Sequence, residues 1–132
     1  MATKLGYVIN ASSVGFQLTN TIGGTQQTGD SVFLPANSLT KTGGKDGNFI
    51  QIPDATPPVQ FFSRDNTNLS AGSTNLYVYG TKGVVYWLLN SSPSSTNNGT
   101  EFTGSSSFGE GFLVISQEGG NWTLALYDIN SI

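Results

Sequence analysis

Apolar and polar residues alternate with a period of two along most of the chain. The alternation is clearest in residues 5–9, 14–18, 50–52, 59–61, 76–79 and 122–127. Because successive side chains of a strand point to opposite faces, this pattern predicts strands with one face on a core and the other toward solvent. The sets expected to share a face are Leu5, Tyr7 and Ile9; Val14, Phe16 and Leu18; Leu76 and Val78; and Trp122, Leu124 and Leu126.

Two runs are apolar at every position, residues 84–89 and 112–115. Such runs are typical of central strands that are covered on both faces. Turn-forming pairs such as Lys82-Gly83 separate the strands. The clearest hairpin joins residues 112–117 to 121–127 through Glu118-Gly119-Gly120, where glycine supplies the positive φ that a tight turn needs.

The apolar residues do not recur at the i, i+3, i+4 and i+7 spacing of a helix, and helix-forming residues are scarce. The pattern therefore predicts an all-β fold, a single-domain antiparallel β-sandwich or jelly roll of about nine or ten short strands over residues 1–132. A β-trefoil is the alternative, but the three thirds of the chain share no pattern.

The composition is polar but not that of a disordered chain. Ser, Thr, Asn and Gly make up 60 of the 132 residues, yet 34 are Ile, Leu, Val or Phe and the net charge is only −3. Cys and His are both absent, which excludes disulfides, thiol nucleophiles, imidazole bases and metals held by those residues. Acidic residues outnumber basic ones, 8 to 5, so nucleic acid is not an expected partner.

The N-terminal residues lack the basic segment and apolar run of a signal peptide. No stretch approaches the roughly 20 apolar residues that a membrane-spanning helix needs. We therefore expect a cytoplasmic protein, or one exported without a signal peptide of the usual kind.

Most of the carboxylates lie in turn segments, and their spacing does not place two on one inward face. A catalytic pair of carboxylates is therefore not expected, and we predict that the protein is not an enzyme. Loop oxygens in residues 65–68 and 46–48 could bind calcium, but neither segment has the ligand spacing of an EF-hand. We expect no cofactor; calcium, bound by oxygens of these loops, is the alternative.

Tyr77, Tyr79, Tyr86 and Trp87 cluster within eleven positions on two successive strands. An aromatic ring packs on the apolar face of a sugar, and neighbouring amides, hydroxyls and carboxylates bind the sugar's hydroxyls. We expect Tyr77 and Tyr79 to face outward; for Trp87, packing in the core is the alternative. The candidate ligand-binding residues are Asp65, Asn66, Tyr77, Tyr79, Trp87, Asn97 and Asn98.

Residues 59–66 read Val-Gln-Phe-Phe-Ser-Arg-Asp-Asn. A turn rich in glycine and threonine, an aliphatic-aromatic strand, a Tyr-Trp pair and a Pro/Ser/Asn loop follow, up to residue 98. This succession resembles the middle of the aegerolysins, a family of small acidic β-sandwich proteins. The matching positions are Arg64, Gly72, Thr74, Leu76, Tyr86, Trp87, Pro93 and Asn97.

The chain departs from that family in two ways. It has no Cys, and the family's Trp-Asp-x-Pro-Trp run is here Trp87-Leu88-Leu89-Asn90. The resemblance implies recognition of membrane lipids, with a partner protein that forms the pore.

The residues favour a non-enzymatic, lectin-like protein that binds a glycan or glycolipid at a cell surface. One alternative is an aegerolysin-like membrane-lipid-binding or toxin component, since amphipathic aromatic rings also suit a membrane surface. Another is a self-assembling structural subunit, a homo-oligomer, because strands of low charge with few lysines pair readily at their edges.

Overall fold

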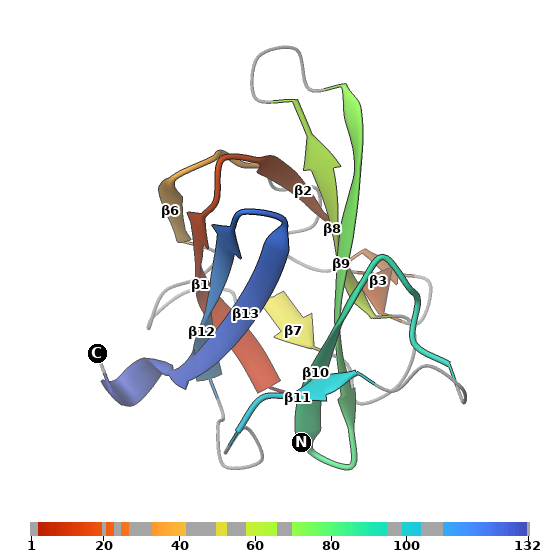
Figure 1. Cartoon of the computed structure of the whole chain (residues 1–132). Helices are drawn as coiled ribbons and strands as arrows, with labels where there is room; N and C mark the ends of the chain where they lie inside the picture. The colour runs from red at the N-terminus through yellow and green to blue at the C-terminus, as the bar shows by residue number, and fades with distance from the viewer. Residues whose placement is uncertain are drawn as a thin grey trace.

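The computed structural model describes residues 3–19, 21–22, 25–26, 33–41, 50–52, 58–65, 70–94, 99–103 and 110–131. Most of their strands form two sheets that pack on each other as a β-sandwich, as predicted (Figure 1). Nine of the described strands have three residues or more, within the predicted range. Two packed sheets are a different architecture from the β-trefoil alternative.

The first sheet has five strands in the order β13-β12-β1-β6, and β7 also pairs with β1. Its strands are β1 (Thr3–Ala11), β6 (Ser38–Lys41), β7 (Ile50–Ile52), β12 (Glu110–Glu118) and β13 (Asn121–Asp128). The β1–β12 pair is parallel, whereas the other pairs are antiparallel. A parallel pair needs a long connection, which the many residues between β1 and β12 supply.

The second sheet has six strands in the order β11-β10-β9-β8-β2-β5. They are β2 (Gly15–Thr19), β5 (Phe33–Leu34), β8 (Val59–Arg64), β9 (Ala71–Thr81), β10 (Val84–Leu89) and β11 (Thr100–Glu101). A separate pair joins β3 (Thr21–Ile22) to β4 (Thr25–Gln26), and the 3-10 turn η2 (Ile129–Ser131) follows β13.

One core lies between the two sheets and takes residues from both. The predicted inward faces of most strands are confirmed, because alternate residues of β2, β8, β9, β12 and β13 are buried there. The core residues are Leu5, Val8, Phe16, Leu18, Leu34, Ile52, Val59, Phe61, Leu76, Val78, Val85, Phe102, Leu113, Ile115, Leu124 and Leu126.

Two contacts tie the sheets together at one end. The ring of Trp122 on β13 meets the ring of Phe16 on β2 edge-on, with centroids 5.5 Å apart and planes at 79°. The Asn10 side chain on β1 is 1% exposed, and its amide nitrogen lies 2.8 Å from the Val14 carbonyl oxygen and 3.2 Å from that of Leu34 on β5. A buried amide needs such partners, so this network fixes where β1 meets the second sheet.

The prediction that Leu5, Tyr7 and Ile9 share one buried face is wrong. The pairing of β1 with β12 shifts register between Leu5 and Tyr7, so a bulge interrupts the alternation. Leu5 and Val8 are therefore buried, whereas Tyr7 and Ile9 are half-buried on the outer face.

The expectation that the two continuous apolar runs are covered on both faces is also wrong. Val85 in β10 is buried, as are Leu113 and Ile115 in β12, but their neighbours in sequence are half-buried. A two-layer sandwich covers each sheet on one side, so alternate apolar residues of these strands, Val84, Tyr86 and Leu88 in β10 and Phe112 and Val114 in β12, lie on the outer faces. On the second sheet, Tyr86 belongs to the candidate site.

Candidate functional site

The β9–β10 hairpin positions the tyrosines that the sequence singles out. Its turn is Lys82-Gly83, with φ angles of 54° and 81°. Two successive positive φ values define the two-residue turn that best matches the twist of paired strands. The turn sets the register that places Tyr79 opposite Tyr86 and Tyr77 opposite Leu88.

This register brings three tyrosines to the outer face of the second sheet, where each is half-buried. The rings of Tyr79 and Tyr86 stack, with centroids 5.4 Å apart and planes at 19°. Tyr77 and Tyr79 face outward, as predicted, because they alternate with Leu76 and Val78, which are buried on the other face.

The next strand, β8, extends the same face. Gln60 on β8 lies opposite Tyr77, and Phe62 lies opposite Asn75. The Arg64 guanidinium lies over the Phe62 ring, with Cζ 5.8 Å from the ring centroid, a cation–π distance. We call this surface the tyrosine face and define it by Gln60, Phe62, Tyr77, Tyr79 and Tyr86.

A hollow of about 360 Å³ opens on the tyrosine face. Its lining residues are Tyr79, Thr81, Tyr86, Ser94 and Gly99. Stacked rings form one wall, and hydroxyl-bearing residues complete it. Aromatic surface beside a few polar groups is the usual composition of a site for a small ligand.

The chain after β10 returns to this hollow and is held there by Tyr79. The Tyr79 hydroxyl oxygen accepts a hydrogen bond from the Gly99 N–H at 2.7 Å. Gly99 has no room for a side chain, because a Cβ atom would lie 2.6 Å from the Trp87 carbonyl oxygen and 2.7 Å from the Tyr79 hydroxyl. A glycine is therefore required for this close approach.

Trp87 does not join the tyrosines. It follows Tyr86 directly and therefore points to the opposite face of the sheet, where it lies opposite Val78 and packs, partly exposed, against the core. The predicted grouping of Trp87 with Tyr77 and Tyr79 is wrong for this reason, and its packing matches the core alternative.

Asp65 does not meet the tyrosines either. It is exposed at the end of β8, and its N–H donates to the Ser70 carbonyl oxygen at 2.8 Å. The adjacent pair Arg64–Ala71 is six residues along β9 from Tyr77, or about 20 Å at the rise of an extended strand. Asn66, Asn97 and Asn98 lie outside the described residues.

Several residues of the site were not predicted. Gln60 and Phe62 reach it only through the pairing of β8 with β9, and Gly99 only through the return of the chain after β10. Tyr86 could have been found from the sequence, since it belongs to the aromatic cluster. Once the hairpin register is known, it lies opposite Tyr79 and therefore on the same outward face.

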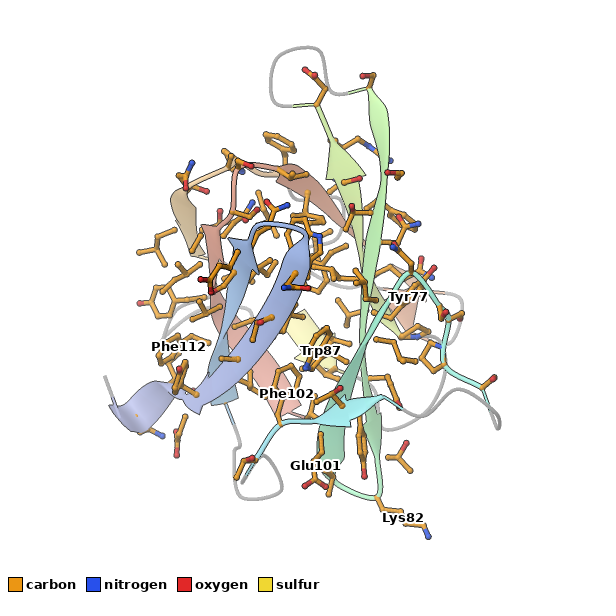
Figure 2. All side chains as sticks on the ribbon, in the orientation of Figure 1. Tyr77, Lys82, Trp87, Glu101, Phe102 and Phe112 are labelled. Atoms are coloured by element: carbon orange, nitrogen blue, oxygen red, sulfur yellow. The ribbon has the colours of Figure 1, made fainter. Side chains whose placement is uncertain are left out.

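A second concavity, of about 580 Å³, lies at the side of the sandwich between β11 and β13. Trp87 and Phe102 line it from the second sheet, with residues 123–128 of β13 on the other side. Figure 2 shows both aromatic side chains in the space between β13 and the β10–β11 strands. We call it the edge cleft.

In the described part of the chain, no three His, Cys, Asp or Glu side chains gather where they could hold a metal ion. The calcium candidate at 46–48 and most of that at 65–68 lie outside the described residues. Among the residues that the structure places, no helix has the length and apolar character needed to cross a membrane.

Comparison with known protein families found no matching family model, and comparisons with curated proteins and with solved structures found no match. The aegerolysin resemblance therefore stays a hypothesis carried by residues 59–98.

Proposed function

We propose that this protein is a non-enzymatic, lectin-like domain that binds a glycan, free or on a glycolipid, through the tyrosine face. The observation that carries the proposal is the stacked pair Tyr79–Tyr86 at the wall of a hollow that also contains Thr81 and Ser94. The C–H face of a sugar packs on an aromatic ring, and its hydroxyls bond to hydroxyl and amide groups.

The polar groups of the tyrosine face favour a neutral ligand. Gln60 and Asn75 supply amides beside Tyr77, and the cation of Arg64 lies over Phe62 toward the far end of β8. The net charge of −3 disfavours polyanions such as nucleic acid. A neutral sugar therefore matches this surface better than a phosphate-rich ligand.

The same inventory favours binding over catalysis. The chain has no His or Cys, and in the described part of this sheet Glu101, opposite Tyr86, contributes a carboxylate beside the stacked pair. Hydrolysis of a glycosidic bond uses two carboxylates at a defined separation. One carboxylate can bind a sugar hydroxyl, which supports recognition.

The test is a glycan array followed by calorimetric titration with the best soluble glycan. Tyr79→Ala removes half of the stacked pair, and we expect affinity to fall about tenfold, the equivalent of one aromatic contact. Tyr127→Ala is the matched control, because Tyr127 also stacks on a cross-strand ring, that of Phe112 at 5.0 Å and 23°, but on the other sheet. Equal losses in both variants, or an array without any binding glycan, would refute the proposal.

The aegerolysin-like alternative predicts a different result. Flotation with liposomes made of phospholipid alone, and with liposomes that also carry a glycolipid, separates the two. Flotation only with glycolipid, reduced by Tyr79→Ala, supports sugar recognition. Equal flotation with both preparations supports lipid recognition instead.

A further inference from the structure

β13 ends the five-stranded sheet, and in the described part of the chain it pairs with β12 alone. The edge cleft runs beside it, and its lining includes residues 123–128 of β13 without a gap. Because successive residues point to opposite faces, a cleft lined by consecutive residues follows the edge of the strand rather than one of its faces. The edge is where a further strand could pair.

The backbone of β13 presents alternate residues to this edge. The two-residue turn Gly119-Gly120 makes Glu118 and Asn121 the first hydrogen-bonded pair of the β12–β13 hairpin. Residues 121, 123, 125 and 127 therefore bond toward β12, because the bonding direction alternates along an antiparallel strand. The N–H and C=O groups of Trp122, Leu124 and Leu126 point the other way, toward the edge.

The sequence of β13 is close to a palindrome about Ala125, Thr-Leu-Ala-Leu-Tyr over residues 123–127. An antiparallel pairing of two copies centred there places Ala125 opposite Ala125 and Leu124 opposite Leu126 of the second copy. Both leucines have edge-directed backbone groups, so this register forms hydrogen-bonded pairs at those positions.

We propose that two copies of this chain associate through β13, so that their five-stranded sheets join into one continuous sheet. A two-fold axis relates antiparallel strands, which keeps inward-facing residues on the inward side in both copies. Leu124 and Leu126 of each copy then cover the apolar floor of the other copy's edge cleft beside Trp87 and Phe102.

Charge favours a second copy as the occupant. In the register centred on Ala125, residues 122–128 of the two copies pair, and their one charged side chain, Asp128, lies opposite Trp122 of the other copy rather than opposite a like charge. Charged residues, Lys above all, are the usual means of blocking an exposed edge strand. Two copies can therefore approach along this edge without like charges facing each other between these residues.

The size of the contact indicates a reversible dimer. Seven paired residues span about 24 Å, and two sheets with their side chains about 20 Å, so the flat footprint is roughly 500 Å² per copy. That is slightly below the ~600 Å² per partner at the lower limit of standard specific interfaces. We therefore expect association that depends on protein concentration rather than a permanent dimer.

The decisive experiment uses opposite charges at the symmetry axis. Ala125 is half-buried on the outer face, so that Ala125→Lys and Ala125→Asp each place like charges across the axis of a homodimer. Each should weaken self-association about tenfold or more in analytical ultracentrifugation. In an equimolar mixture of the two variants, Lys faces Asp across the axis, and association should be restored as a heterodimer. High salt should weaken this heterodimer.

Val114→Lys is the matched control. Val114 lies opposite Ala125 on β12, on the same outer face but one strand further from the edge. An edge-to-edge dimer should keep its affinity in this variant. Loss of association in Val114→Lys equal to that in Ala125→Lys would overturn the proposal in favour of face-to-face packing.

Amide hydrogen exchange gives a second measurement, independent of any variant. On dimerisation the N–H groups of Leu124 and Leu126 should become more protected as concentration rises.

A wild-type chain that stays monomeric at all concentrations, a variant mixture that does not associate, or a monomer whose edge takes up an unrelated extended peptide would each overturn the proposal. The glycan affinity measured by calorimetry should be unchanged in the Ala125 variants, so failure of this proposal is distinguishable from failure of sugar binding.

Discussion

Tyr86 and Trp87 are neighbours in sequence but lie on opposite faces of the second sheet. Tyr86 stacks on Tyr79 at the outer hollow, whereas Trp87 packs against the core and lines the edge cleft. One dipeptide therefore contributes to both surfaces that carry the proposals. Substitutions on the outer face can consequently test sugar binding without altering the edge cleft, and substitutions at the edge cleft can test association without altering the tyrosine face.

Gly99→Ala is expected to destabilise the protein by about 1–3 kcal/mol, the usual cost of forcing atoms into a packed site. The new Cβ would meet the Trp87 carbonyl oxygen at 2.6 Å, and backbone cannot move aside as a flexible side chain can. Urea denaturation measures the change. Gly120→Ala is the control, because nothing lies within 4 Å of its Cβ position, and it should be neutral or slightly stabilising. Equal effects of the two substitutions would contradict the close approach at Gly99.

Tyr79→Phe separates the ring of Tyr79 from its hydroxyl. The ring stack with Tyr86 remains, but the Gly99 N–H loses its acceptor at 2.7 Å. We expect a loss of about 1 kcal/mol in the free energy of unfolding, the net worth of one hydrogen bond. Tyr127→Phe should change it little, since Tyr127 is 48% exposed and its hydroxyl is accessible to water. An unaltered stability in Tyr79→Phe would show that this bond does not hold the chain in place.

Asn10→Ala should cost about 3 kcal/mol, because it leaves buried carbonyl oxygens without their donor. The Asn10 amide nitrogen lies 2.8 Å from the Val14 oxygen and 3.2 Å from those of Leu34 and Pro35. Asn10→Asp should cost more, since it sets a carboxylate among the same oxygens. Asn121→Ala, at an exposed position, is the control and should stay within about 0.5 kcal/mol of wild type. Thermal unfolding followed by circular dichroism measures all three.

Lys82→Asn should stabilise the β9–β10 hairpin. Lys82 has a φ of 54°, which costs energy for a residue with a long side chain, and Asn-Gly is the preferred pair for this turn. We expect a gain of about 0.5 kcal/mol in unfolding free energy. A decrease would show that the Lys82 side chain makes a contact worth more than the relief of strain.

Much of the fold could be predicted because period-two alternation is a local property. Phe16, Leu18, Leu124 and Leu126 are buried as their spacing indicates. The alternation fails in β1, where the bulge after Leu5 turns Tyr7 outward. A bulge depends on the pairing with β12, whose residues come about a hundred positions later.

The candidate site was predictable only in part. The outward position of Tyr77 and Tyr79 follows from their alternation with buried neighbours, but Asp65 lies about 20 Å along the strand from Tyr77. Proximity in sequence suggested that Asp65 belonged to the same site, whereas the extended geometry of a hairpin separates its two ends. Asn66, Asn97 and Asn98 are outside the described residues, and their role stays a prediction.

The sequence by itself determined the fold class, the positions of most strands and most of the inward-facing apolar residues, because these depend on alternation and turn chemistry within a few residues. The tertiary structure decided which strands are neighbours, and with that which surfaces exist. Gln60 reaches Tyr77, and β11 approaches β13, only when strands distant in the chain are brought together. Such contacts depend on the register and packing of whole sheets, which no local pattern encodes.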